Sequence, residues 1–390
     1  MRPPVATGID QIADGTATLR GGAVGVITNM TGVDRDFRPT GAVLRERGSD
    51  VRALFAPEHG ISGAAQAGEG NAWRDPAMPD VPVYDTYGEK SRRGADGMIA
   101  SIRQADVDHV VFDIQDVGAR FWTYSSTMYD ALIAAATLDI AITVLDRPNP
   151  IGGVISEGHP APDRPWQGTF VGRAPIPARH GLSFGELATS FNDGPVRAQA
   201  GKPADLVVIE LTGWQRDTYL DRVEGYPWVF PSPNLPTVET ALVYPGLCLF
   251  EGTTLSEGRG TTRPFELIGA PYVDARLAPA AGERALPGVT FRPVSFTPTQ
   301  SKHEGVLVHG VQVHVRDRDT FRPVLTALTL LDVLIELYGG EVTWRELAGR
   351  YSLDSLWGSD ELRVLHAEGR PLAGAAREPT APQSWATLRY

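Results

Sequence analysis

The segment Leu54–Gly60 reads LFAPEHG and closes a short apolar run. Proline has no N–H to donate to a sheet, so a strand is predicted to end at Pro57, and Gly60 permits a sharp turn. In an open parallel sheet, residues just past the carboxyl end of a strand face the ligand crevice. Glu58 and His59 are therefore predicted to face such a crevice, although a Glu-His pair alone is equally typical of a solvated loop.

The first 150 residues repeat this pattern. Apolar, β-branched runs cover residues 23–27, 51–56, 81–84, 109–114 and 141–145, with helical patterns at 40–47, 97–105 and 125–138. The spacing is that of βαβ units, in which successive parallel strands are joined by helices. We therefore predict an α/β fold built on a parallel sheet with helices on both faces.

Polar loops follow all five runs. They cover Thr28–Gly32, Pro57–Gly60, Tyr84–Gly88, Asp113–Arg120 and Asp146–Pro150. Parallel strands place these loops at one edge, where they bring carboxylates, amides, an imidazole and arginines to a single crevice. None of them carries the glycine fingerprint of a dinucleotide site or of a P-loop, so we predict no nucleotide and no other cofactor.

The second half of the chain follows a proline-rich connector, residues 228–236. We predict two domains, residues 1–229 and 230–390. The stretch 249–265 fits no helix or strand period, and is either a solvated loop or the second wall of the crevice. Strands are predicted at 205–211, 291–296 and 306–315, and a helix at 319–338; Ser183–Glu186 reads as a capping box, and the tail from Pro371 is predicted to pack loosely.

Composition excludes several classes of protein. The chain has 390 residues, a net charge of −11 and no basic run, which argues against a nucleic-acid partner. The single cysteine, Cys248, rules out an intramolecular disulfide. The longest apolar segment, residues 324–337, is too short to span a bilayer, and the N-terminus lacks the apolar core of a secretory signal. The sequence as written therefore predicts a cytoplasmic protein with no membrane span.

The polar loops of the sequence are best suited to acid/base catalysis by carboxylates. The eight histidines show no HExxH spacing, and no GxSxG elbow occurs, so a zinc hydrolase and a serine hydrolase are disfavoured. Glycoside hydrolysis needs one carboxyl to protonate the leaving oxygen and a second to act as nucleophile, base or charge stabiliser. The residues alone are compatible with this reaction without selecting it.

Five polar motifs, in the same order, resemble one known family. The motifs are PEHG at 57–60, FDIQDVGAR at 112–120, LDRPNP at 145–150, PSPN at 231–234, and EGT at 251–253 with SEGRGT at 256–261. They are similar to those of the NamZ-type exo-β-N-acetylmuramidases, and the likeness extends from about residue 20 to 340. It implies a Rossmann-like domain joined to a smaller α+β C-terminal domain, with the active cleft between them. It also implies release of terminal N-acetylmuramic acid from the non-reducing end of peptidoglycan fragments.

The resemblance also implies roles for single residues. Glu58 occupies the position of the family's proposed catalytic residue, here the general acid/base, with His59 tuning it. Asp116 or Glu257 is the second carboxylate, and Arg259 is a candidate partner for the lactyl carboxylate of muramic acid, because a guanidinium matches a carboxylate bidentately. The candidate substrate-binding residues are Asn29, Asp113, Gln115, Arg120, Tyr124, Asn149, Asn234, Glu251 and Arg259.

Some of these candidates have a structural alternative. Asp113 and Asn149 are equally suited to bracing their own loops, and Tyr124 to packing in the core. The partner is predicted to be a muro-saccharide or another peptidoglycan fragment. The rival functions are a metal-assisted amidase or deacetylase acting on cell-wall fragments, and an amino-sugar-binding protein without turnover. Many relatives act outside the cytoplasm, and the missing export signal is a departure from them.

Overall fold

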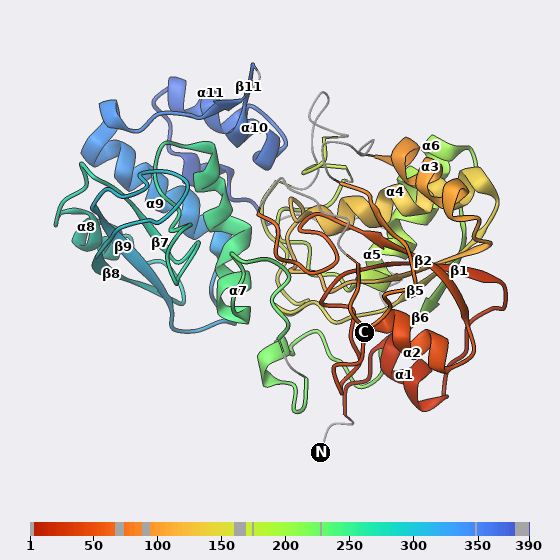
Figure 1. The fold of residues 1–390 in the computed structure, drawn as a ribbon. Helices are drawn as coiled ribbons and strands as arrows, with labels where there is room; N and C mark the ends of the chain where they lie inside the picture. Colours follow the sequence, from red (N-terminus) through yellow and green to blue (C-terminus); the bar gives the residue numbers. More distant parts are fainter. Residues whose placement is uncertain are drawn as a thin grey trace.

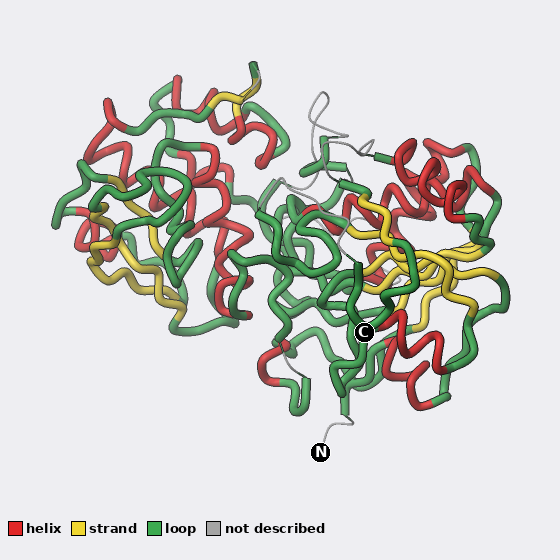
Figure 2. The backbone as a smooth tube through the Cα atoms, in the orientation of Figure 1, coloured by secondary structure: helices red, strands yellow, loops and turns green. Residues whose placement is uncertain are grey.

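The computed structural model describes residues 4–66, 74–87, 94–159, 169–173, 175–226, 228–347, 349–378 and 390. Two sheets organise these residues, each with its own set of helices (Figure 1). Loops fill much of the space between the larger sheet and the second part of the molecule (Figure 2). Gly88, the end of one predicted polar loop, and residues 379–389 of the predicted tail lie outside the described residues.

The larger sheet has six parallel strands in the order β3-β2-β1-β4-β5-β6. The strands are β1 Ala23–Thr28, β2 Asp50–Ala56, β3 Val83–Asp85, β4 His109–Asp113, β5 Ala141–Leu145 and β6 Asp205–Ile209. This is the Rossmann order, which confirms the predicted α/β fold. The order reverses between β1 and β4, so the crevice for a ligand is expected at the carboxyl ends of these two strands.

Helices cover both faces of this sheet. They are α1 Gly8–Asp14, α2 Thr40–Glu46, α3 Ala95–Ala105, α4 Thr123–Leu138, α5 Phe184–Phe191 and α6 Arg197–Ala200. Alternate residues of β4 belong to different cores: Val111 packs with α1 and α2, whereas Val110 and Phe112 pack with α3, α4 and α5. Burial on both faces explains why the strands are continuous apolar runs. The capping box at Ser183–Glu186 is confirmed at the start of α5.

The second part contains the antiparallel sheet β7-β9-β8 and five helices among the described residues. Its strands are β7 Leu267–Ala270, β8 Val289–Phe296 and β9 Val308–Val315, with a small hairpin of β10 Glu346–Leu347 and β11 Arg350–Tyr351. Its helices are α7 Val238–Leu247, α8 Leu277–Glu283, α9 Pro323–Tyr338, α10 Ser352–Trp357 and α11 Glu361–Ala367. This confirms the predicted smaller α+β unit.

Two predictions about the second part are wrong. The helix expected from residue 319 begins at Pro323, because proline is well suited to the first helical position. The chain from Pro371 is not loose at its start: Leu372 is buried and its N–H donates to Asp332 Oδ1 at 2.8 Å.

The helical stretch Pro323–Glu341, which is α9 with the 3₁₀ turn that follows it, is long and apolar enough to cross a membrane by length and composition. Most of its apolar window is buried inside the protein, and α9 packs against α7 and α8. These contacts are those of a core helix in a globular unit.

Two buried charges join the parts. The carboxylate of Glu157 accepts hydrogen bonds from the N–H groups of Val324, at 3.2 Å, and Leu325, at 2.7 Å, in the first turn of α9. The guanidinium of Arg120 donates to the carbonyls of Leu356, at 3.1 Å, and Trp357, at 2.7 Å, in the last turn of α10. An anion at a helix N-terminus and a cation at a C-terminus both complement the helix dipole.

Arg120 has a structural role in this joint, and its predicted contact with substrate stays a prediction. Besides the two α10 carbonyls, its guanidinium donates to those of His159, at 2.6 Å, and Ile176, at 2.9 Å. Burial lowers the pKa of Arg120 to about 9, so it remains charged at neutral pH.

We predict that Arg120→Met lowers the free energy of unfolding by about 3 kcal/mol or more, because buried carbonyls lose their donors. Urea denaturation measures this loss. Arg52→Met is the control: Arg52 is exposed, and its loss is expected to cost less than about 0.5 kcal/mol. A stable Arg120→Met protein with a raised KM would contradict the structural role and restore a substrate contact.

Candidate active site

Glu58 and His59 lie directly after β2, at the sheet edge where the polar loops begin. The backbone turns sharply there, since His59 has φ of 68° and Gly60 has φ of 71°. A positive φ is uncommon for a residue with a side chain, and such conformations concentrate at functional sites. The His59 ring is fixed by its Nδ1, which lies 2.8 Å from the carbonyl oxygen of Ala65.

The Glu58 carboxylate lies against the start of α4. The Thr123 hydroxyl donates to Glu58 Oε2 at 2.6 Å, and Thr123 is the first residue of the helix. Glu58 is only 7% exposed. The predicted acid/base residue is thus a nearly buried carboxyl with one oxygen held by a neutral donor.

Tyr124, the next residue of α4, braces the same loop. Its hydroxyl donates to the carbonyl oxygen of Pro231 at 2.8 Å and lies 3.4 Å from that of Glu58. It accepts a hydrogen bond from Asn29 Nδ2 at 2.8 Å. Burial, helped by the nearby Glu58 carboxylate, raises the pKa of Tyr124 well above its ordinary value, so the phenol stays neutral.

This network gives Asn29 and Tyr124 a structural role, and their predicted contact with substrate stays a prediction. Tyr124 is fully buried, so its ring is not available to stack on a sugar. The amide oxygen of Asn29 is occupied by the N–H and the hydroxyl of Thr31, at 2.9 and 2.7 Å. Both residues fix the ends of β1 and β2 relative to the connector.

Asp113 and Asn149 also brace neighbouring loops, as the structural alternative expected, and their predicted contact with substrate stays a prediction. Asp113 forms a bidentate ion pair with Arg147, at 2.5 and 2.9 Å, and accepts a hydrogen bond from Thr40. Asn149 accepts from the N–H of Ile151 at 3.1 Å and donates to the carbonyl of Leu182 at 3.0 Å. Asp113 and Asn149 are fully buried.

Asp116 is paired with a histidine. His180 Nδ1 accepts the N–H of Leu182 at 3.1 Å, so a neutral His180 ring carries its proton on Nε2. That nitrogen lies 3.0 Å from Asp116 Oδ2 without making a hydrogen bond, and Oδ2 accepts the N–H of Gly118 at 2.8 Å. Asp116 Oδ1 is buried and has no hydrogen-bond partner among the described residues.

The other predicted residues form a cluster in the second part. Arg259 bonds Glu251 Oε1 through Nη2, at 2.5 Å, and through Nε, at 3.0 Å; its Nε lies 3.4 Å from Glu257 Oε1. Lys302 Nζ lies 2.6 Å from Glu257 Oε2. Burial alone lowers the pKa of Arg259, but the two carboxylates outweigh it and raise that pKa above its ordinary value. The stretch around Arg259 is therefore tied down by charge pairs, which excludes the solvated-loop reading.

A packed column of rings connects the Glu58 loop to this cluster. His59 stacks on Trp122 with ring centroids 6.0 Å apart, and Trp122 meets Tyr244 edge to face at 5.7 Å. Tyr244 contacts Phe265 at 4.8 Å, and the Arg259 guanidinium lies 5.0 Å from the Phe265 ring. The two sets of predicted site residues are thus held at the two ends of one rigid contact path.

Within the part of the chain that the structure describes, several buried polar atoms near the sheet edge lack a hydrogen-bond partner. They are Gln115 Oε1, Asp116 Oδ1, Trp122 Nε1 and Asn234 Nδ2. Such groups are uncommon in folded proteins, because leaving a buried donor or acceptor unpaired costs free energy. Gln115 Oε1 and Asn234 Nδ2 are therefore available to a ligand, whereas the amide oxygens of Asn29 and Asn149 already accept hydrogen bonds.

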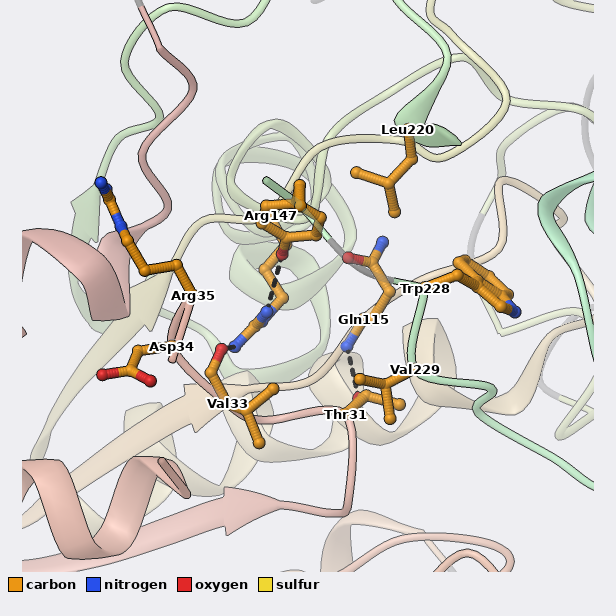
Figure 3. Close-up of a pocket in the computed structure, with 10 residues that line it drawn as sticks. Thr31, Val33, Asp34, Arg35, Gln115, Arg147, Leu220, Trp228 and Val229 are labelled. Carbon is orange, nitrogen blue, oxygen red and sulfur yellow. Dashed lines mark hydrogen bonds between the residues drawn. The ribbon is translucent and has the colours of Figure 1, made fainter. Parts of the chain in front are cut away.

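A narrow pocket opens beside Gln115 (Figure 3). Its free volume is about 10 Å³, near that of a single water position. Glu58 is not among the described residues that line it. Its lining residues are Thr31, Val33, Asp34, Arg35, Gln115, Arg147, Leu220, Tyr226, Trp228 and Val229.

Sequence reasoning missed Thr123, Trp122, His180 and Lys302. Trp122 and Thr123 lie two and three residues after the FDIQDVGAR motif, and this proximity could have indicated that they belong to the site. Lys302 lies in the loop between β8 and β9, far along the chain from Glu257, and nothing local to it indicates the pairing.

Comparisons with known proteins agree with this arrangement. A model described as "Exo-beta-N-acetylmuramidase NamZ, N-terminal" matches residues 24–239, and one described as "Exo-beta-N-acetylmuramidase NamZ, C-terminal" matches residues 242–376. The peptidoglycan beta-N-acetylmuramidase NamZ of Bacillus subtilis (strain 168) is 44% identical over 372 residues, which cover 94% of this chain and 86% of that protein.

Two solved structures of DUF1343 family proteins from Bacteroides fragilis NCTC 9343 share the fold. One is 32% identical with a TM-score of 0.83, and the other is 28% identical with a TM-score of 0.68. Each comparison covers 94% of this chain and 92% of the other. With family matches across both parts of the molecule, this chain belongs to the NamZ exo-β-N-acetylmuramidase family.

Proposed function

We propose that this protein is an exo-acting glycoside hydrolase that releases β-1,4-linked N-acetylmuramic acid from the non-reducing end of peptidoglycan fragments. Membership of the NamZ family and the 44% identity to a peptidoglycan beta-N-acetylmuramidase support this activity. The observation that carries it is the position of Glu58: a nearly buried carboxyl at the carboxyl edge of a Rossmann sheet, one oxygen of which accepts a hydrogen bond from Thr123.

In the proposed mechanism Glu58 moves a proton to or from the glycosidic oxygen. The second carboxylate is Asp116 or Glu257, as the reaction needs a partner that stabilises charge, attacks, or activates water. The two candidates differ in their surroundings: Glu257 lies between Arg259 and Lys302, whereas Asp116 has a histidine beside one oxygen and no partner on the other. The separation of the two carboxyls sets whether the anomeric configuration is retained or inverted.

Substrate contacts are proposed for groups that still have hydrogen-bonding capacity. Gln115 Oε1 and Asn234 Nδ2 are suited to sugar hydroxyls or to the acetamide group. Arg259 is proposed to recognise the lactyl carboxylate; its side chain is 17% exposed and oriented by Glu251 and Glu257. A guanidinium already fixed in place loses little conformational entropy when it binds.

Two further predictions from the sequence are kept as proposals. Residues 1–229 act as the catalytic domain and residues 230–390 contribute to the cleft. The protein acts in the cytoplasm, where its substrates are small muro-saccharides, and cell fractionation tests this location.

We predict that Glu58→Gln lowers kcat on an aryl β-N-acetylmuramide by ~10²–10⁴-fold, because glutamine has nearly the same shape and cannot transfer a proton. The matched control is Glu224→Gln, since Glu224 is exposed, and full activity is expected there. Near-full turnover by Glu58→Gln would remove Glu58 from this role.

We predict that Arg259→Ala reduces the preference for an aryl N-acetylmuramide over the matching aryl N-acetylglucosaminide by about tenfold or more, the effect of losing one charged hydrogen bond. The ratio of the two kcat/KM values measures this preference. Equal losses on both substrates would show that Arg259 supports the loop without reading the lactyl group.

A further inference from the structure

We propose that Thr123 is a positioning residue for the reaction: its hydroxyl fixes the orientation of the Glu58 carboxylate. This inference rests on the proposed function of Glu58 and adds a residue to it. Thr123 lies outside the five motifs that resemble the family pattern.

The contact itself is short and buried. Thr123 Oγ1 donates to Glu58 Oε2 at 2.6 Å, within the range for a hydroxyl bound to an ionised carboxylate. Thr123 is 8% exposed and Glu58 is 7% exposed, so bulk water competes little for this bond. A hydrogen bond is electrostatically stronger in such surroundings than in water.

The residues on either side of Thr123 hold the backbone of the same dipeptide. The Trp122 ring stacks on His59, and the Tyr124 hydroxyl lies 3.4 Å from the carbonyl oxygen of Glu58. Of these three consecutive residues, Thr123 is the one whose side chain contacts the carboxylate. The start of α4 thus fixes both the main chain and the reactive group of Glu58.

The chemical consequence concerns the direction of the carboxylate. The Thr123 hydroxyl holds Oε2 against the first turn of the 16-residue helix α4, which fixes the plane of the Glu58 carboxylate. A reacting group that is already oriented loses less entropy in the transition state. Loss of the Thr123 hydroxyl is therefore expected to lower the rate of the chemical step more than substrate binding.

The test compares three variants of the full-length enzyme on an aryl β-N-acetylmuramide. Thr123→Val keeps the shape and removes the donor; we expect kcat to fall about tenfold or more and KM to change little. Thr123→Ser keeps the donor and should restore kcat. The control is Thr127→Val, one turn along α4, whose buried hydroxyl bonds the carbonyl of Thr123 and does not contact Glu58.

The inference fails if Thr123→Val matches Thr127→Val in kcat and KM, or if Thr123→Ser behaves like Thr123→Val. Thermal unfolding shows whether each variant is folded, and Thr123→Ala replaces Thr123→Val if the latter is not. In a Glu58→Gln background, Thr123→Val should have little additional effect on the residual rate, because Thr123 acts through the carboxylate. Full activity of Glu58→Gln alone would refute the proposed function, whereas an inactive Glu58→Gln with an indifferent Thr123→Val would refute only this inference.

Discussion

The buried guanidinium of Arg120 is the interaction on which the arrangement of the two parts depends. It bonds carbonyls from the 159–176 region of the sheet domain and from the end of α10, 236 residues or more along the chain. Glu157 makes the reciprocal contact at the start of α9. The contacts of Arg120 and Glu157 are both hydrogen bonds made by a buried charge. They therefore set the orientation of the second part before any ligand binds. Catalysis benefits, since reacting groups that are already in place lose less entropy in the transition state.

Several polar residues at the sheet edge support this preorganisation. Asp113, Asn149, Asn29 and Tyr124 use their polar atoms on neighbouring loops. Their hydrogen bonds hold in place the few groups that still have hydrogen-bonding capacity. The packed aromatic rings that include Trp122 extend this rigid region toward Arg259. In a site of this kind several supporting residues position each reacting group, because accurate positioning requires them.

The sequence predicted the elements well where burial imposes a pattern. The strands of the large sheet were placed within a few residues, because parallel strands buried on both faces are uninterrupted apolar runs. Helix α7 was not predicted, since it is buried nearly all round and shows no 3.6-residue period. The roles of polar residues were the least predictable: a motif locates Arg120 and Asp113 at the correct edge, but their partners lie 34 to 237 residues away in sequence. Thr123 was overlooked because its partner, Glu58, is set by tertiary packing.

The most direct test of the central claim is a crystal structure of the Glu58→Gln enzyme bound to a disaccharide with a non-reducing terminal N-acetylmuramic acid. The account predicts that residue 58 lies within hydrogen-bonding distance of the glycosidic oxygen, that Asp116 or Glu257 lies on the other side of the anomeric carbon, and that the lactyl carboxylate meets Arg259. A terminal sugar bound away from residue 58, or with no carboxylate facing it, would contradict the account.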